Sequence, residues 1–205
     1  MAGELFIIGA VRGLVSEGER VRAAIAKHRP EAVGLAVSKE GLAAMNSPAG
    51  PGPGDAKPQN PEERAYIRGL GEFGEVVKPP PCFSAALGSG MPITPLDMDD
   101  EHYTAAYCRY VSTWDMMRQG RSAGAVLRHK FRANNPQDFV LEWDRLVNRP
   151  GGYRRLEASR ELWLAKGACR MAAAHSRTLV VVEFERLKGV LRCLERLGCP
   201  CTVIK

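Results

Sequence analysis

Short apolar runs alternate with segments of helical spacing along most of this chain. Five apolar runs have the length of β-strands: 5–8, 32–37, 91–96, 178–184 and 202–204. Segments with helical character lie between or beside them: 16–27, 62–73, 101–119, 137–148, 156–174 and 187–197. A strand, a helix and a strand with short connections form a parallel, right-handed unit. The pattern therefore predicts an α/β protein with a mostly parallel central sheet flanked by helices.

Two stretches depart from this alternation. Residues 46–61, NSPAGPGPGDAKPQNP, predict a flexible Pro/Gly-rich loop, either a lid or an inert excursion. Residues 100–175 are mostly helical and long enough to cap the sheet on one side. Within them, several aromatic and apolar residues share one helical face and are expected in the core: Tyr103, Ala106, Tyr107, Tyr110, Val111 and Trp114. A length of 205 residues suits a single α/β domain, 1–205, that contains both stretches.

The composition is that of an ordinary globular protein, with 45% hydrophobic and 25% charged residues. It excludes wholesale disorder and a disulfide-stapled miniprotein. No apolar run approaches the ~20 residues needed to cross a bilayer, and the start lacks a basic leader, so a cytoplasmic protein without a membrane segment is expected. We expect Cys108, Cys169 and Cys193 to be small buried hydrophobes. Cys199 and Cys201 fit a turn into the last strand, with metal or redox chemistry as the alternative.

The net charge of +6 favours weak attraction to anions. The basic residues are dispersed along the chain, and the densest stretch, 118–132, is interrupted by small and apolar residues. A solvated surface is therefore expected rather than a nucleic-acid interface, which would need a contiguous basic face. A small anionic ligand or a peptide is the expected partner, and a homodimer is kept open. No motif specifies a cofactor.

Charged residues follow the predicted strands, where open α/β sheets bind their ligands. Arg12 follows a glycine-flanked turn, and its planar guanidinium suits a carboxylate or a phosphate. Asp97, Asp99 and the neighbouring Asp100 suit either a hard cation or the cap of a following helix. Glu183 follows the Val-rich strand. No histidine follows a strand, and there is neither a nucleophile elbow nor a placed Cys–His pair.

The order of these motifs resembles the TraB/PrgY pheromone-shutdown family, which is grouped with the Tiki, GumN, erythromycin-esterase-like and ChaN-like proteins. The opening strand ending in Gly9-Ala10-Val11-Arg12 and the stretch RPEAVGLAVSKEGLAAM resemble the start of that family. Later segments agree in order: GMPITPLDMDD, EASRELWLAKGACRMAA and HSRTLVVVEFERLKGV. The resemblance covers most of residues 4–197, apart from the Pro/Gly-rich loop. It implies an α/β fold and a metal-dependent peptidase or related hydrolase.

This chain departs from the family pattern at the metal-binding positions. The family uses two G-x-x-H turns and a glutamate after the second strand. Here Arg12 and Arg186 stand in place of the two histidines, and Ala36 stands in place of the glutamate. An arginine stays protonated and does not ligate a metal as a neutral imidazole does. The resemblance thus implies a divergent member with no metal site of that design.

The remaining residues predict a different pocket. If the resemblance holds, Arg12 and Arg186 face one another above the sheet. The ligand-binding set is then Arg12, Arg186, Arg160, Asp97 and Asp99, and the candidate general acids or bases are Glu183 and Glu185. We expect binding of a small anionic ligand or a peptide terminus. The alternatives are hydrolysis with non-standard residues and a non-catalytic scaffold module; a direct Arg–Glu pair would favour the scaffold.

Overall fold

One five-stranded sheet organises the fold. The computed structural model describes residues 3–47 and 61–204. All strand pairs in it are parallel, and the strand order is β3-β2-β4-β1-β5. The strands are β1 Glu4–Ala10, β2 Ala32–Leu35, β3 Ile93–Pro95, β4 Arg177–Glu183 and β5 Thr202–Ile204. The predicted α/β class with a parallel central sheet is therefore confirmed.

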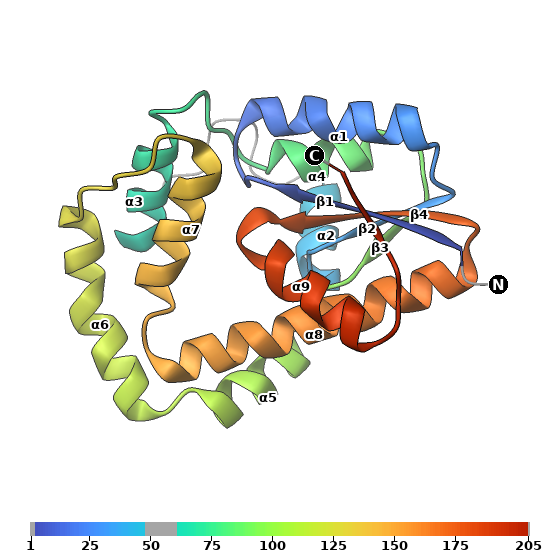
Figure 1. The fold of residues 1–205 in the computed structure, drawn as a ribbon. Coiled ribbons are helices and arrows are strands. Elements are labelled where there is room, and N and C mark those ends of the chain that lie inside the picture. Colours follow the sequence, from blue (N-terminus) through green and yellow to red (C-terminus); the bar gives the residue numbers. More distant parts are fainter. Residues whose placement is uncertain (1–2, 48–60, 205) are drawn as a thin grey trace.

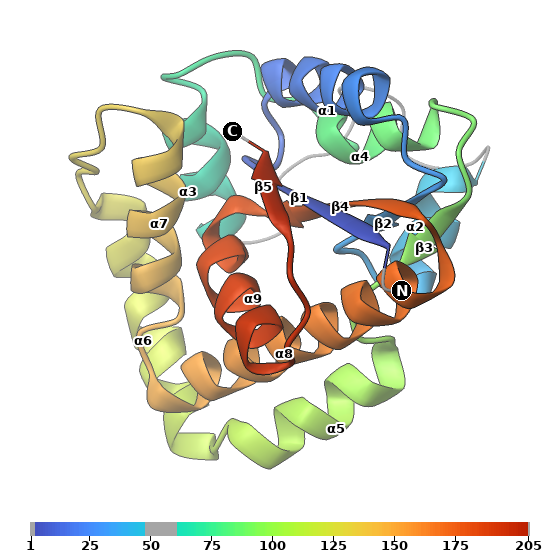
Figure 2. The same ribbon diagram turned by 45° about the vertical axis from the view of Figure 1, so that its right-hand side comes forward.

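Helices cover both faces of this sheet. The helices are α1 Val15–His28, α2 Lys39–Asn46, α3 Pro61–Leu70, α4 Pro81–Leu87, α5 Asp100–Tyr110, α6 Thr113–Arg128, α7 Pro136–Val147, α8 Gly151–Ala174 and α9 Phe184–Arg196. Helices α1 and α4 lie over one face, and α8 and α9 lie over the other (Figures 1 and 2). Successive strand residues point to opposite faces: Ile7 packs into the core beside α8 and α9, and Ile8 into the core beside α1 and α4. Both faces are buried, which explains why the strands are continuous apolar runs.

A third layer of helices lies beyond the carboxyl ends of the strands. Val11 and Leu14, which directly follow β1, pack against Leu70 of α3 and Phe139 of α7. Helix α6 lies on the outer side of α3 and α7 (Figure 1). Residues 100–174 contain α5, α6, α7 and α8. Together with α3, helices α6 and α7 lie beyond the edge of the sheet at which β1 and β4 end (Figure 1).

The predicted helix 101–119 is in fact two helices. Helix α5 ends at Tyr110, and α6 begins at Thr113. Ser112 accepts a hydrogen bond from the Asp115 amide, and the Asp115 carboxylate accepts one from the Ser112 amide. This capping box satisfies amides at the new helix start, so the chain turns a corner there. The helical spacing of aromatic residues continues from α5 to Trp114 in α6, so the sequence pattern did not indicate the break between the two helices.

The expected core face of this segment is also wrong in part. No residue of α5 is buried; Tyr103 is 39% exposed, and Trp114 at the start of α6 is 56% exposed. Only Val111, at the corner, is buried. The cysteine expectation fails in the same way, since Cys108 is exposed and Cys169 and Cys193 are only partly buried. Helical spacing identified a common face but not whether another element covers it.

Two short helices were not predicted. Ser38 caps α2 by accepting a hydrogen bond from the Gly41 amide, and Pro81 opens α4. Helix α1 begins at Val15, one residue before the predicted helical segment 16–27. Most of the predicted Pro/Gly-rich loop, 48–60, lies outside the described residues. In the described part of the chain, no helix is both long and apolar enough to span a bilayer.

Candidate functional site

The turn after β1 holds Arg12 in a fixed backbone position. The hydroxyl of Tyr66 donates a hydrogen bond of 2.8 Å to the carbonyl of Arg12. The next carbonyl, that of Gly13, accepts a hydrogen bond of 2.9 Å from the amide of Val77. Gly13 has φ +108°, a conformation that glycine adopts without a steric penalty. The strand-end glycine pattern in the sequence thus builds a clamped turn that presents one arginine.

The Arg12 side chain is held more loosely than its backbone. Its Nη1 lies 2.9 Å from Oε1 of Glu183, the last residue of β4, and its guanidinium carbon lies 5.9 Å from the Tyr66 ring centre. The side chain is 42% exposed, against 9% for Glu183. No other hydrogen-bond partner of the guanidinium is found among the described residues. Within residues 3–47 and 61–204, its Nε and Nη2 donors thus have no acceptor and can serve a ligand.

Arg12 lies at the border of two neighbouring cavities. The first, which we call the strand-end cavity, has a volume of about 480 Å³ and is lined by Arg12, Ala36, Val37, Ser38, Gly41, Met45, Pro80, Phe83, Asp97, Met98, Asp100, Tyr103, Arg160 and Glu183. The second, the side cavity, has a volume of about 460 Å³. Its walls include Tyr66, Ile67, Val76 and Trp143. Four predicted site residues thus meet at one cavity: Arg12, Asp97, Arg160 and Glu183.

Arg160 of α8 is fully occupied by carboxylates. Its Nε lies 3.3 Å from Oδ1 of Asp97, its Nη2 contacts the other Asp97 oxygen, and its Nη1 lies 2.9 Å from Glu157. Burial by itself lowers the pKa of Arg160, but Glu157 and Asp97 outweigh this and hold that pKa well above its usual value. Arg160 and Asp97 both line the strand-end cavity, and they form an ion pair with each other.

Arg186 lies in the first turn of α9 and is buried, with a side chain 5% exposed. Its Nη1 lies 3.3 Å from Glu157 and 3.4 Å from Glu161, and its Nη2 contacts Asp144 of α7. Burial and the nearby charge of Arg12 lower the pKa of Arg186 to about 10, so it stays protonated at neutral pH. Arg186 lines neither cavity. The two arginines are neighbours, but each is held by carboxylates of its own.

Glu183 and Glu185 occupy different environments. Glu183 lines the strand-end cavity and pairs with Arg12. Glu185, two residues later in α9, is buried and lines neither cavity, and its Oε2 has no hydrogen-bond partner. Burial and the adjacent charge of Glu183 raise the pKa of Glu185 to about 8, so it is mostly protonated at neutral pH.

Asp99 serves the helix rather than the cavity. Its side chain accepts a hydrogen bond of 2.9 Å from the His102 amide at the start of α5, and Lys39 lies 3.0 Å away. The hydrogen bonds from His102 keep the pKa of Asp99 well below its usual value. This is the capping alternative seen in the sequence. Asp100, its neighbour, lines the strand-end cavity instead.

Sequence reasoning missed the partners of Arg186. Asp144, Glu157 and Glu161 lie on α7 and α8, far from any strand end, so no positional signal singled them out. Gly189 was also missed. A Cβ atom built on Gly189 would lie 1.9 Å from the Glu161 carboxyl carbon, so the missing side chain makes room for that carboxylate. A glycine inside a helix was the one available hint that a close approach was needed there.

Comparison with known protein families and curated proteins gives no match. No protein-family model matches the chain, and no curated protein matches it at a significant level. Among the described residues, no group of three or more His, Cys, Asp or Glu side chains is arranged to hold a metal ion. The functional conclusion therefore depends on the strand-end and side cavities and on the arginine between them.

Proposed function

We propose that this protein binds a small anionic ligand or a peptide terminus, with Arg12 as the anchor. The supporting observation is the contrast among three neighbouring arginines. Arg160 and Arg186 are each surrounded by carboxylates, whereas Arg12 has a single carboxylate contact, is 42% exposed and borders both cavities. A guanidinium with unused donors on a clamped backbone is preorganised to bind a carboxylate.

The surrounding charges favour a singly charged ligand. Glu183, Asp97 and Asp100 also line the strand-end cavity, and these carboxylates repel a second negative charge. A carboxylate is therefore preferred over a phosphate dianion. The side cavity offers apolar surface from Ile67, Val76 and Trp143 within reach of the same arginine. A carboxyl-terminal residue with an apolar side chain matches both features, because its charge meets Arg12 and its side chain enters the side cavity.

The test is a binding titration of the full ¹⁵N-labelled chain, followed by NMR. The probes are glycyl-leucine, acetate and inorganic phosphate. We expect glycyl-leucine to shift the Arg12 Nε–H and Gly13 amide resonances more strongly than acetate, and phosphate to bind more weakly than either. Arg12→Gln should weaken the binding of glycyl-leucine at least tenfold, since it removes the charge and the planar fork.

Arg177→Gln is the matched control. Arg177 is 49% exposed and pairs with Glu4 at the opposite end of β4. The control variant therefore removes a similarly exposed arginine that lies away from both cavities. Should Arg12→Gln fail to fold, Arg12→Lys keeps the charge and loses the fork, and a several-fold weaker affinity is expected. The proposal is overturned if no probe shifts the resonances around Arg12, or if Arg12→Gln binds glycyl-leucine as the unmodified chain does.

A non-catalytic scaffold is the second candidate. The direct Arg12–Glu183 pair favours it, as do the ion pairs of Arg186 and Arg160. In that case the strand-end charges serve only to hold the strand ends and α7, α8 and α9 together, and the titration above gives no shifts. Hydrolysis is less well supported: Glu185 has the pKa of a general acid but borders neither cavity. Of the three positions at which the resemblance places the family's metal ligands, Arg12 and Ala36 line one cavity and Arg186 does not. Membership as a divergent TraB/PrgY-like chain stays a proposal.

A further inference from the structure

The positive charge of this protein is concentrated in one part of the chain. Residues 103–155 contain ten Arg and Lys residues and four Asp and Glu residues, so this segment has a formal charge of +6, equal to that of the whole chain. All ten basic residues are exposed: Arg109, Arg118, Arg121, Arg128, Lys130, Arg132, Arg145, Arg149, Arg154 and Arg155. We call the end of the molecule that carries them the basic lobe.

The four acids of the same segment have other partners. Asp115 is buried and caps α6, and Asp144 binds Arg186. Glu142 accepts hydrogen bonds from His129 and from the Arg132 amide, and Asp138 accepts one from the Asn135 side chain. The charges of Arg155 and Arg145 act on Asp115 and Glu142, but within the described residues none of the ten basic side chains forms a direct ion pair with a carboxylate. The ten cations are therefore exposed, and their charges repel one another unless an external anion lies between them.

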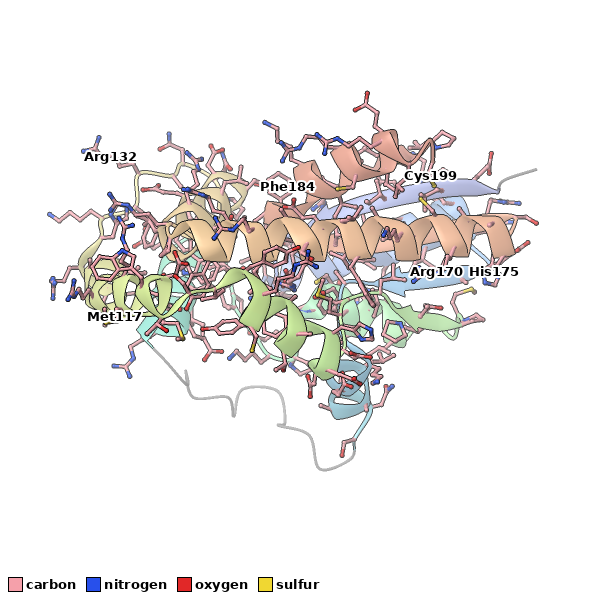
Figure 3. All side chains as sticks on the ribbon, turned by 90° about the horizontal axis from the view of Figure 1, so that it is seen from below. Met117, Arg132, Arg170, His175, Phe184 and Cys199 are labelled. Carbon is pink, nitrogen blue, oxygen red and sulfur yellow. The ribbon has the colours of Figure 1, made fainter. Side chains whose placement is uncertain are left out.

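The fold brings these cations together. They come from α5, α6, the following segment 129–135, the end of α7 and the start of α8. Figure 3 shows nitrogen-bearing side chains gathered at the end of the molecule where Arg132 and Met117 are labelled, whereas Arg170 and His175 lie at the opposite end. Helix α6 alone, with 16 residues, extends about 24 Å. Basic residues that are dispersed in the linear sequence are thus collected toward one end of the molecule.

The chemistry of the basic lobe fits a nucleic-acid strand. Nine of its ten cations are arginines, whose planar forks match phosphate oxygens. Trp114, Met116 and Met117 are exposed at the start of α6, next to Arg118. An exposed indole beside arginines provides a surface on which an unpaired base stacks. We propose that the basic lobe binds single-stranded nucleic acid, with its arginines on successive phosphates and Trp114 against a base.

A membrane surface fits less well. An interfacial helix must leave its apolar face free to enter the lipid. In α6 the buried apolar residue, Val126, faces inward, where the helix packs against α3 and α7. Among the α6 side chains that the structure describes, the large exposed hydrophobic ones are Trp114, Met116 and Met117 in its first turns. The arrangement is therefore suited to an extended polyanion, and this binding is independent of the ligand proposed for Arg12.

The test uses the full chain and a fluorescein-labelled 20-nucleotide oligothymidine, followed by fluorescence anisotropy at 50, 100 and 200 mM KCl. If about half of the ten cations engage phosphates, log K falls with log[salt] with a slope of about −3.5, so affinity drops about 100-fold over this range. Arg118→Glu/Arg121→Glu should weaken binding at least tenfold at 100 mM and make the slope shallower by about 1.4. Trp114→Ala should weaken binding at least fivefold.

Lys166→Glu/Arg170→Glu is the matched control, because it changes the net charge equally on the exposed surface of α8, and Arg170 is far from the basic lobe (Figure 3). Less than a threefold effect is expected. If Arg118→Glu/Arg121→Glu loses its helical circular dichroism, Arg145→Glu/Arg149→Glu replaces it; Arg145 is on α7 and Arg149 lies just beyond its end. The proposal fails if no binding occurs at 50 mM KCl, if the control double variant loses as much affinity, or if phosphatidylserine vesicles bind the basic lobe in preference to the oligonucleotide.

Discussion

Arg186→Met is the substitution that most directly tests the charge network beneath the candidate site. The arginine is buried in the first turn of α9 and contacts Asp144, Glu157 and Glu161. Methionine has a similar length and keeps much of the packing, so the variant removes the guanidinium without opening a large cavity. Three carboxylates then lose the cation that they share, and Arg160 is already held by Asp97 and Glu157.

The expected loss of stability is about 3–5 kcal/mol, the usual cost of removing one partner from a buried ion pair. This is a large fraction of the roughly 5–15 kcal/mol that stabilises a domain. The loss should depend on pH. Without the guanidinium, the folded carboxylates bind protons more tightly than the unfolded chain does, so stability falls as pH rises through their folded pKa values. Glu161, whose pKa burial already raises to about 7, titrates in this window. The deficit is therefore larger at pH 8 than at pH 5.5.

The assay is urea unfolding of both proteins at pH 5.5 and pH 8, monitored by circular dichroism and compared at equal m-values. Lys188→Met, on the exposed side of the same helix, is the control and should change stability by less than about 1 kcal/mol. A deficit below about 1 kcal/mol at pH 8 would refute the reasoning, since Arg186 would then be dispensable to its carboxylates. A deficit that grows toward pH 5.5 would refute the assigned protonation.

Two further substitutions probe the same region. Burial raises the pKa of Glu185 to about 8, so its proton stabilises the fold fully below pH 4.5 to 5, and this stabilisation is lost as pH rises through 8. The free energy of unfolding of the unmodified chain should fall by about 2–4 kcal/mol between pH 5 and pH 9. In the same urea series, the free energy of unfolding of Glu185→Gln should fall clearly less. Gly189→Ala gains about 1 kcal/mol of helix propensity but displaces Glu161, so it should stabilise the protein only in a Glu161→Ala background. Equal effects in both backgrounds would show that Glu161 does not need the space at Gly189.

Much of the fold followed from the linear pattern. The apolar runs around β1, β2 and β4 predicted buried parallel strands, because only a sheet covered on both faces needs strands that are apolar at every position. Parallel strands end at one edge, so charged residues that follow the strands were expected at that edge. That Arg12 meets Glu183 at 2.9 Å depends on the pairing of β1 with β4, which the sequence did not predict.

What only the tertiary structure decided is which partner each charge has and which helix face is covered. Asp144 and Arg186 meet across 42 positions of sequence because α7 packs against α9, and no local pattern encodes that contact. The break at Ser112 turned the aromatic face of 101–119 partly outward, and the same folding gathered scattered arginines into the basic lobe. Local periodicity reflects the geometry of one element, whereas burial and charge pairing depend on the neighbours that long-range packing supplies.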